Sequence, residues 1–208
     1  MYKRLMFAAV FAMMLAACTG HKETHLSAQF DDNAPESLRV TVHGMIDTTV
    51  YVKGGKCEVD VPVNVTSVSR IHAGKAVYSF ISDGSRITLV PAEGKAYSDQ
   101  KKGVHSRFVE YNKWLEEFLA TYHQKVGEMG DDKEAADAYF KEMQEKYNDY
   151  QRATIKANKD NVLASVALSH LNSDDPKEIL SLINSLSPEI QALPDVAGLK
   201  KEFASKDK

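Results

Sequence analysis

The sequence is short of cysteine and has no excess of positive charge, and both absences exclude classes of function. It has two cysteines in 208 residues, Cys18 and Cys57. Two thiols exclude a framework of several disulfides and a zinc site built from several cysteines. The formal net charge is -3 and the basic residues are scattered, so we expect no nucleic-acid partner, whose binding depends on neutralising phosphates. The composition, 43% hydrophobic and 26% charged, predicts a globular protein rather than a disordered one.

Motifs that carry catalysis or bind a cofactor are also missing from the sequence. No serine lies in a Gly-x-Ser-x-Gly turn, and no glycines have the spacing of a phosphate-binding loop. The seven histidines lack the paired spacing of a helical zinc motif, and His170 lies in an apolar segment where we expect a core histidine. The acidic pairs Asp131-Asp132 and Asp174-Asp175 stand where helix caps are needed. The sequence therefore predicts no enzyme, no metal site and no cofactor.

The N-terminus carries the strongest signal in the chain. Residues 1–4 are basic, and the apolar run from Leu5 to Ala17 is shorter than the about 20 residues of a membrane-spanning helix. This pattern predicts a signal peptide over residues 1–17. The run ends at Leu15-Ala16-Ala17-Cys18, which resembles the lipobox of bacterial lipoproteins. We therefore expect cleavage before Cys18, lipid on its sulfur, and an exported protein anchored to a bacterial membrane, the outer membrane facing the periplasm. The alternative is a plain secretory signal.

Residues 37–98 alternate apolar and polar side chains with a period of two, which predicts an antiparallel β domain. Glycines between two alternating runs, at Gly54-Gly55 and within Ser82–Ser85, predict a hairpin at each place. Pro62 predicts a strand end or a bulge. Residues 18–36 are polar, and we expect them to form a lipidated flexible tether in which His21 and His25 are not held together.

From residue 104 to 208 the apolar residues recur every three or four positions, which predicts an α-helical region. Two stripes joined by a short glycine-containing connection predict an antiparallel helical hairpin over residues 105–157, with Leu115 and Phe140 buried. Trp114 and Tyr139 lie beside the stripes, where we expect exposure. Further helix starts are indicated at Asp175-Pro176, at Ser187-Pro188 and at Asp195. The fold class expected for the chain is α+β.

Cys57 is the one thiol left for chemistry if Cys18 takes lipid. It alternates with Val59 and Val61, which favours a buried position where cysteine behaves as a small hydrophobic residue. The alternative is an exposed lone thiol with a lowered pKa, able to form a mixed disulfide. The triplet Asp47-Thr48-Thr49 resembles the acceptor of a periplasmic O-glycosylation system, but so short a signal recurs by chance.

Several short motifs give the chain a resemblance to a known family. Four segments carry it: Val40–Gly44, Gly54–Val59, with Cys57 where the family has phenylalanine, Phe80–Leu89, and Asn158–Ala164. They are similar to an opening strand, a glycine-lysine-aromatic strand, a closing hairpin and an asparagine-rich helix junction. The family is the N-terminal domain of unknown function of lipoproteins that carry a C-terminal thioredoxin-like domain.

The resemblance implies an accessory module, and the expected thioredoxin-like domain is absent. The chain has no Cys-x-x-Cys motif, so the family's thiol-disulfide activity does not carry over to it. Our first hypothesis is a non-enzymatic cell-envelope module that binds a protein partner or ligand near the membrane. The alternative is an accessory subunit of thiol-disulfide or peroxide metabolism, acting through Cys57 or with a separate thioredoxin-like protein. A buried Cys57 would leave the alternative only in its partner-mediated form.

Overall fold

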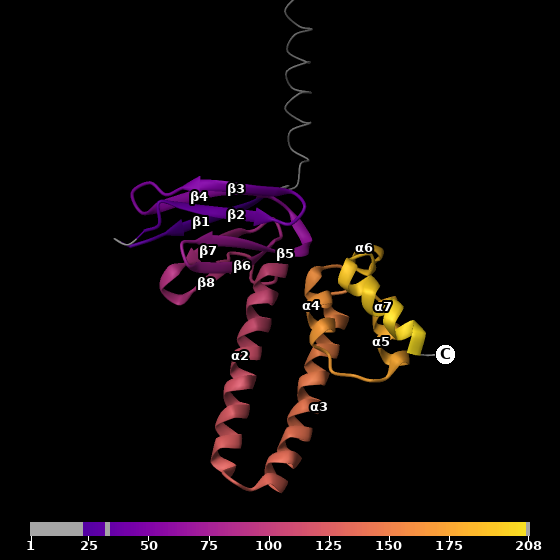
Figure 1. Ribbon diagram of the computed structural model, residues 1–208. Helices are drawn as coiled ribbons and strands as arrows, with labels where there is room; N and C mark the ends of the chain where they lie inside the picture. The colour runs from indigo at the N-terminus through magenta and orange to yellow at the C-terminus, as the bar shows by residue number, and fades with distance from the viewer. Residues whose placement is uncertain (1–22, 32–33, 207–208) are drawn as a thin grey trace, which may run out of the picture.

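The computed structural model describes residues 23–31 and 34–206, and it consists of a β-sandwich followed by an α-helical region (Figure 1). The α+β fold class expected from the sequence is confirmed. The predicted signal peptide and Cys18 lie outside the described residues. Within the described part, no helix combines the length and the apolar character that crossing a membrane requires.

The sandwich consists of two four-stranded sheets with a shared core. The first sheet has the order β4 (Lys56–Pro62), β1 (Glu23–Gln29), β7 (Arg86–Val90) and β8 (Lys95–Ser98), and the second has the order β3 (Ile46–Tyr51), β2 (Ser37–Val42), β5 (Asn64–Ala73) and β6 (Ala76–Ser82). All neighbouring strands are antiparallel except β1 and β7, which are parallel. Alternate side chains from both sheets fill the space between them, as the period of two predicts.

The strand β1 corrects the prediction of a flexible tether over residues 18–36. Residues 23–29 lie between β4 and β7, with Leu26 and Ala28 in the core of the sandwich. The hydroxyl of Thr24 is buried and accepts hydrogen bonds from Ser82 Oγ at 2.9 Å and from the Gly84 amide at 2.8 Å. The prediction failed because the apolar side chains of β1 are few and small, and its stability comes from neighbours on both sides.

Both predicted hairpins are wrong, because the strands on either side of each turn do not pair with each other. The chain does turn at Gly54-Gly55 and at 82–85, but β3 and β4 belong to different sheets, as do β6 and β7. The hairpins within a sheet turn at Gly44, at Gly74 and at Pro91–Gly94. Glycine at positive φ reverses the chain in both situations, so a turn signal does not say which strands will pair. Pro62 ends β4, as predicted.

The helical region begins with the predicted antiparallel hairpin, which projects away from the sandwich (Figure 1). The helices are α2 (Val104–Met129), α3 (Lys133–Ala157), α4 (Val162–His170), α5 (Pro176–Asn184), α6 (Pro188–Gln191) and α7 (Pro194–Lys206). The capping role expected for the acidic pairs is confirmed for Asp132 and Asp175, whose side chains accept from Ala135 N and Lys177 N. The last helix begins one residue before Asp195, at a proline that suits the first helical turn.

The hairpin is buried at its base and exposed toward its tip. Phe108, Tyr111 and Ile155 lie in the helical core, together with α4 to α7. Leu115 is only partly buried, and Phe140 is 49% exposed, so the prediction that Phe140 is buried is wrong. The apolar stripes are present on both helices, but in the part of the chain that the structure describes, no third element covers the distal half.

The exposure predicted for three single side chains also needs correction. Trp114 is half-buried rather than exposed, because its ring stacks on Tyr150 with 3.6 Å between the ring centroids. Tyr139 is half-buried and stacks on Tyr122. His170 is exposed at the end of α4 rather than buried in the core, although its Nδ1 lies 2.8 Å from the Tyr111 hydroxyl. In each case, the packing of one helix against another decides the exposure.

His105 joins the hairpin to both sheets of the sandwich. Its fully buried ring accepts from the Ile81 amide of β6 at Nδ1 (3.2 Å) and contacts the Ala96 carbonyl of β8 at Nε2 (3.0 Å). A ring that accepts at one nitrogen and donates at the other is neutral, so these partners assign the hydrogen to Nε2. Burial lowers the pKa of His105, which also favours the neutral form.

The first turn of α2 is held by the turn that links β6 to β7. Asp83 Oδ2 accepts from the His105 amide at 2.8 Å, and so supplies the cap that Gly103 has no side chain to provide. A Cβ at position 103 would lie 2.7 Å from the same carboxylate oxygen. A larger residue at this position would therefore displace the Asp83 carboxylate that caps the helix.

We predict that His105 makes the stability of the protein depend on pH. Because its folded-state pKa is below the usual value, the unfolded chain binds a proton more readily, and stability falls as the pH drops through about 6.5 toward the folded pKa. Urea unfolding at pH 7.5 and pH 5 should show this loss. His105→Gln should cost about 1–3 kcal/mol at pH 7.5 and reduce the pH dependence. His123→Gln, on an exposed face of the same helix, serves as control, and an unchanged pH dependence in His105→Gln would contradict the assignment.

Candidate functional site

Among the described residues, no cluster of metal-ligating side chains marks a candidate site. Within 23–31 and 34–206, no three histidine, cysteine or acidic side chains gather where they could hold a metal ion. His25 pairs with Asp60 at 2.8 Å on the surface of the first sheet, rather than lying in a free tether. His105 is committed to the joint between the sheets and α2. The histidines thus serve local contacts, and the candidate site has to be sought among surfaces.

Cys57 lies on the inner face of β4, as its alternation with Val59 and Val61 predicts. Its side chain is 8% exposed and belongs to the core of the sandwich. Burial raises the pKa of the thiol, which outweighs the hydrogen bond from the Ala28 backbone that acts in the opposite direction. A protonated, covered thiol is a poor nucleophile, so the exposed-thiol alternative is wrong for this cysteine.

A row of stacked aromatic rings fills the space between α2 and α3. Trp114 stacks on Tyr150, Phe118 contacts Tyr147 with 5.4 Å between centroids, and Tyr122 meets Phe140 edge-on at 6.3 Å. Such pairs stabilise a helix pair by about 0.5–1.5 kcal/mol each beyond their buried area. The rings hold the two helices together where no other element packs on them.

One side of this aromatic row is open, and we call it the hairpin groove. It has a volume of about 400 Å³ and is lined by Leu115, Phe118, Leu119, Tyr122, Phe140, Met143, Gln144, Tyr147, His170 and Asn172. Most of the lining is apolar, and polar side chains stand only at its margin. Leu119 is 50% exposed and Phe140 is 49% exposed. Large apolar side chains gathered in a concave surface are typical of a binding site.

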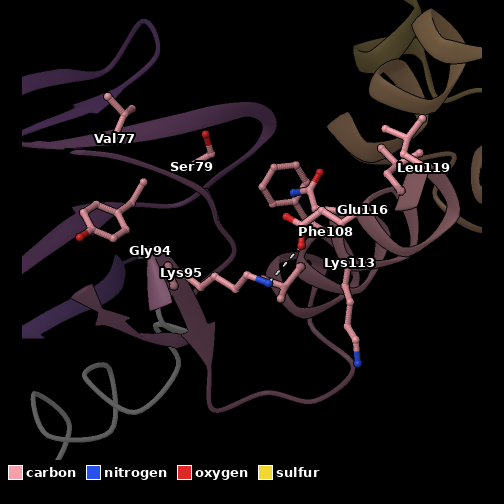
Figure 2. A pocket seen from close by; sticks show the side chains of 13 residues that line it. Val77, Ser79, Gly94, Lys95, Phe108, Lys113, Glu116 and Leu119 are labelled. Carbon is pink, nitrogen blue, oxygen red and sulfur yellow. Dashed lines mark hydrogen bonds and ion pairs between the residues drawn. The ribbon is translucent and has the colours of Figure 1, made fainter. Parts of the chain in front are cut away.

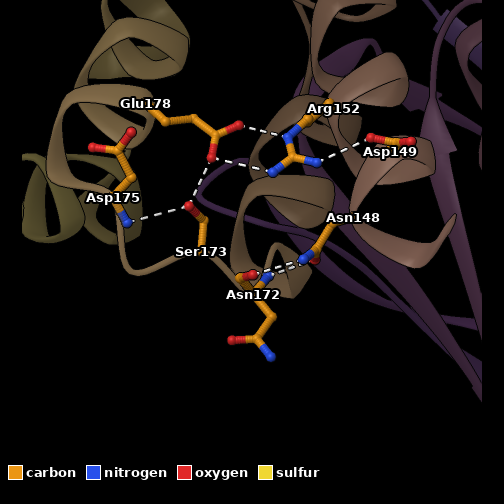
Figure 3. A network of polar contacts seen from close by, with 7 residues as sticks. All are labelled: Asn148, Asp149, Arg152, Asn172, Ser173, Asp175 and Glu178. Carbon is orange, nitrogen blue, oxygen red and sulfur yellow. Dashed lines mark hydrogen bonds and ion pairs between the residues drawn. The ribbon is translucent and has the colours of Figure 1, made fainter. Parts of the chain in front are cut away.

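A polar network fixes the margin of the hairpin groove (Figure 3). The amide of Asn148 on α3 donates to the Asn172 carbonyl at 2.7 Å and accepts from the Asn172 amide at 3.0 Å. Arg152 forms a fork with the Glu178 carboxylate, which also accepts from Ser173. Glu178, three residues after the cap Asp175, thus binds Arg152 on α3. The network places the α4–α5 connection against the hairpin.

Tyr111 is a buried phenol of the helical core that contacts one residue of the hairpin groove. Its hydroxyl donates to Gln151 Oε1 at 2.7 Å and contacts His170, which lines the groove. Burial raises the pKa of Tyr111, so the group stays protonated in the physiological range. A neutral, hydrogen-bonded phenol orients its neighbours and has no role as a base.

A second hollow, which we call the corner groove, lies where α2 leaves the sandwich. Its volume is about 410 Å³, and its walls come from β6, β8 and the flank of α2. Figure 2 shows Lys95 reaching across it to Glu116, with 3.2 Å between Nζ and Oε2. Leu115 and Leu119 line both hollows, so the two are adjacent along α2.

Sequence patterns did not locate either groove. The stripe on α2 was recognised, yet a stripe alone does not show which of its residues remain uncovered. The signal that could have helped is the number of aromatic residues in the distal hairpin. Tyr122, Tyr139 and Phe140 lie there, and the apolar segments of α4 to α7 do not cover them.

We predict that Cys57 has no redox chemistry in the folded protein. In a soluble chain beginning after Cys18, a thiol reagent should label Cys57 slowly until the protein unfolds, because the thiol is covered and its pKa is raised. The matched control moves the thiol one residue to an exposed position, as Cys57→Ser with Glu58→Cys, and should label rapidly. Fast native labelling of Cys57 together with catalysed insulin reduction would overturn the prediction.

Comparison with known proteins assigns no relative to this arrangement of sandwich, hairpin and grooves: no family model, no curated protein and no solved structure matches the chain.

Proposed function

We propose that this protein is a non-enzymatic lipoprotein of the cell envelope that holds a protein partner near the membrane through the hairpin groove. The observation that carries the proposal is the concave apolar surface at Leu119 and Phe140, both half-exposed on a projecting helix pair. The lack of a metal-ligating cluster among the described residues and the burial of Cys57 agree with a binding role.

The hairpin groove fits the apolar face of an amphipathic helix. Two antiparallel helices present parallel ridges with a groove between them, and such grooves accept a helix through anchors spaced three or four residues apart. Each Å² of apolar surface removed from water contributes about 25 cal/mol, so Leu119 and Phe140 offer the largest gain on binding. Gln144, His170 and Asn172 at the margin can hydrogen-bond polar groups of the partner.

The lipid anchor is the second part of the proposal. If Cys18 carries lipid, four residues separate it from β1, which begins at Glu23. The five steps from Cys18 to Glu23 span at most about 18 Å, so the sandwich would stay close to the membrane surface. The hairpin, whose side chains line the groove, projects away from the sandwich (Figure 1).

The thiol-disulfide alternative keeps only its partner-mediated form. A buried Cys57 cannot exchange directly with a substrate disulfide, because exchange needs an accessible thiolate. A separate thioredoxin-like protein would then have to supply both cysteines, and it could dock on the same groove.

We predict that Cys18 is lipidated. Mass spectrometry of the N-terminal peptide from membrane-extracted protein should show a chain that begins at Cys18 and carries acyl groups. Cys18→Ser should release the protein from the membrane, because the described part contains no helix that could replace the anchor. An unmodified peptide that begins upstream of Cys18 would contradict the proposal.

We predict that the hairpin groove contacts one defined protein in the cell. A photo-crosslinking phenylalanine analogue at Phe140 should give a discrete adduct, and Leu119→Asp should abolish it. The matched control places the same analogue at Tyr51, an aromatic residue that is 71% exposed on the sandwich and outside both grooves. Because Phe140 and Leu119 are half-exposed, these changes should cost less than the about 2–5 kcal/mol of a buried residue such as Ile155. Equal adducts at both positions, or none at Phe140, would refute a specific groove.

A further inference from the structure

Strand β6 has a free edge that faces the corner groove. Among the described residues, it is the last strand of the second sheet and has β5 as its one pairing partner. The amide of Ile81 points away from β5, because it donates to His105. Along a strand, residues two apart direct their backbone groups the same way, so the N–H and C=O of Ser79 and Val77 also point outward.

These outward backbone groups have no partner within the described chain. Over residues 23–31 and 34–206, no hydrogen bond involves the N–H or C=O of Val77 or Ser79 at this edge. Both residues line the corner groove, and their side chains are exposed. Donors and acceptors that repeat every two residues, about 6.6 Å apart, match the backbone of another extended chain.

The corner groove encloses this edge at its inner end and along α2. His105 bridges β6 and β8 at the inner end, and the two edge strands border the hollow beyond it. Phe108, Leu115 and Leu119 form an apolar wall on α2, and Val77 is 51% exposed beside it. Lys95 and Glu116 place both signs of charge at the mouth (Figure 2). An occupant would meet backbone hydrogen-bonding groups, an apolar wall and a balanced charge pair.

We propose that the corner groove binds an extended peptide segment of a partner protein, which pairs with the edge of β6 as an added strand. Backbone pairing with Val77 and Ser79 would supply affinity, and an apolar side chain on the α2 wall would supply specificity. A second copy of this protein is a poorer occupant, because its own β6 lies beside its own α2, which would meet the first α2. The site adjoins the hairpin groove proposed for an amphipathic helix, because Leu115 and Leu119 line both, whereas Val77 and Ser79 line the corner groove and Phe140 the hairpin groove.

The test uses the full mature chain in detergent and a display library of random linear dodecapeptides as the probe. Selected peptides should lose at least tenfold in affinity when Val77 or Ser79 is replaced by proline. Proline on an edge strand removes an outward N–H without breaking the ladder to β5, so the variants should fold, which circular dichroism checks. Two peptides methylated at alternate backbone nitrogens provide a further check. Methyl groups on the amides that face β6 should abolish binding, whereas methyl groups on the amides that face away from β6 should not.

Hydrogen exchange provides the second readout, which does not depend on the proline variants. Bound peptide should slow exchange of the Val77 and Ser79 amides, while Tyr78 and Phe80, already paired with β5, should not change. Selected peptides that tolerate both proline variants, a library that yields no binder, or exchange that is unaltered at Val77 and Ser79 would each overturn the proposal. Peptides that lose affinity with Phe140→Asp and not with Val77→Pro would also overturn it, and would support the hairpin groove instead.

Discussion

The buried imidazole of His105 determines how the two halves of the molecule sit together. It satisfies a backbone donor of β6 and a backbone acceptor of β8 at once, and its own amide is capped by Asp83. The edges of the two sheets are thereby held at one end, and α2 leaves the sandwich at a fixed position. The corner groove begins where this bridge ends, so its width depends on the joint. The orientation of the hairpin, and with it the hairpin groove, depends on the same residue.

The distal hairpin shows a different balance of interactions. Near the sandwich, the stripes of α2 and α3 are covered by α4 to α7, and buried side chains such as Ile155 stabilise the fold. Farther out, the aromatic row joins the two helices, and its rings are partly exposed, with Phe140 at 49%. A helix pair that keeps Leu119 and Phe140 exposed gives up part of the stability that burial would provide. A binding partner can recover that stabilisation, which is why the exposed surface and the proposed function belong together.

The position of Cys57 in the sandwich determines whether its thiol can react. It occupies a core position on β4, next to β1, where the strand that was expected to be a tether covers it. β1 therefore contributes to the protection of the thiol as well as to the sheet. Without this strand, β4 and β7 would each lose a neighbour, and the first sheet would separate into two pieces.

The sequence by itself determined the fold class, the hairpin and the position of most helix starts. The period of apolar residues and the caps at Asp132 and Asp175 depend on neighbours within a few residues, so local patterns are sufficient. The inward position of Cys57 followed from the same alternation. Features of this kind could be read before any tertiary contact was known.

Only the tertiary structure decided which strands pair, what covers the stripes and where the grooves lie. The turns at Gly54-Gly55 and at 82–85 have the same local chemistry as hairpins. The strands that follow them, β4 and β7, pair with β1 in the first sheet, whereas the strands that precede them, β3 and β6, belong to the second. Phe140 belongs to an apolar stripe, yet it is 49% exposed, because α4 to α7 pack at the base of the hairpin. Both outcomes depend on contacts between residues distant in the chain, and no local pattern contains them.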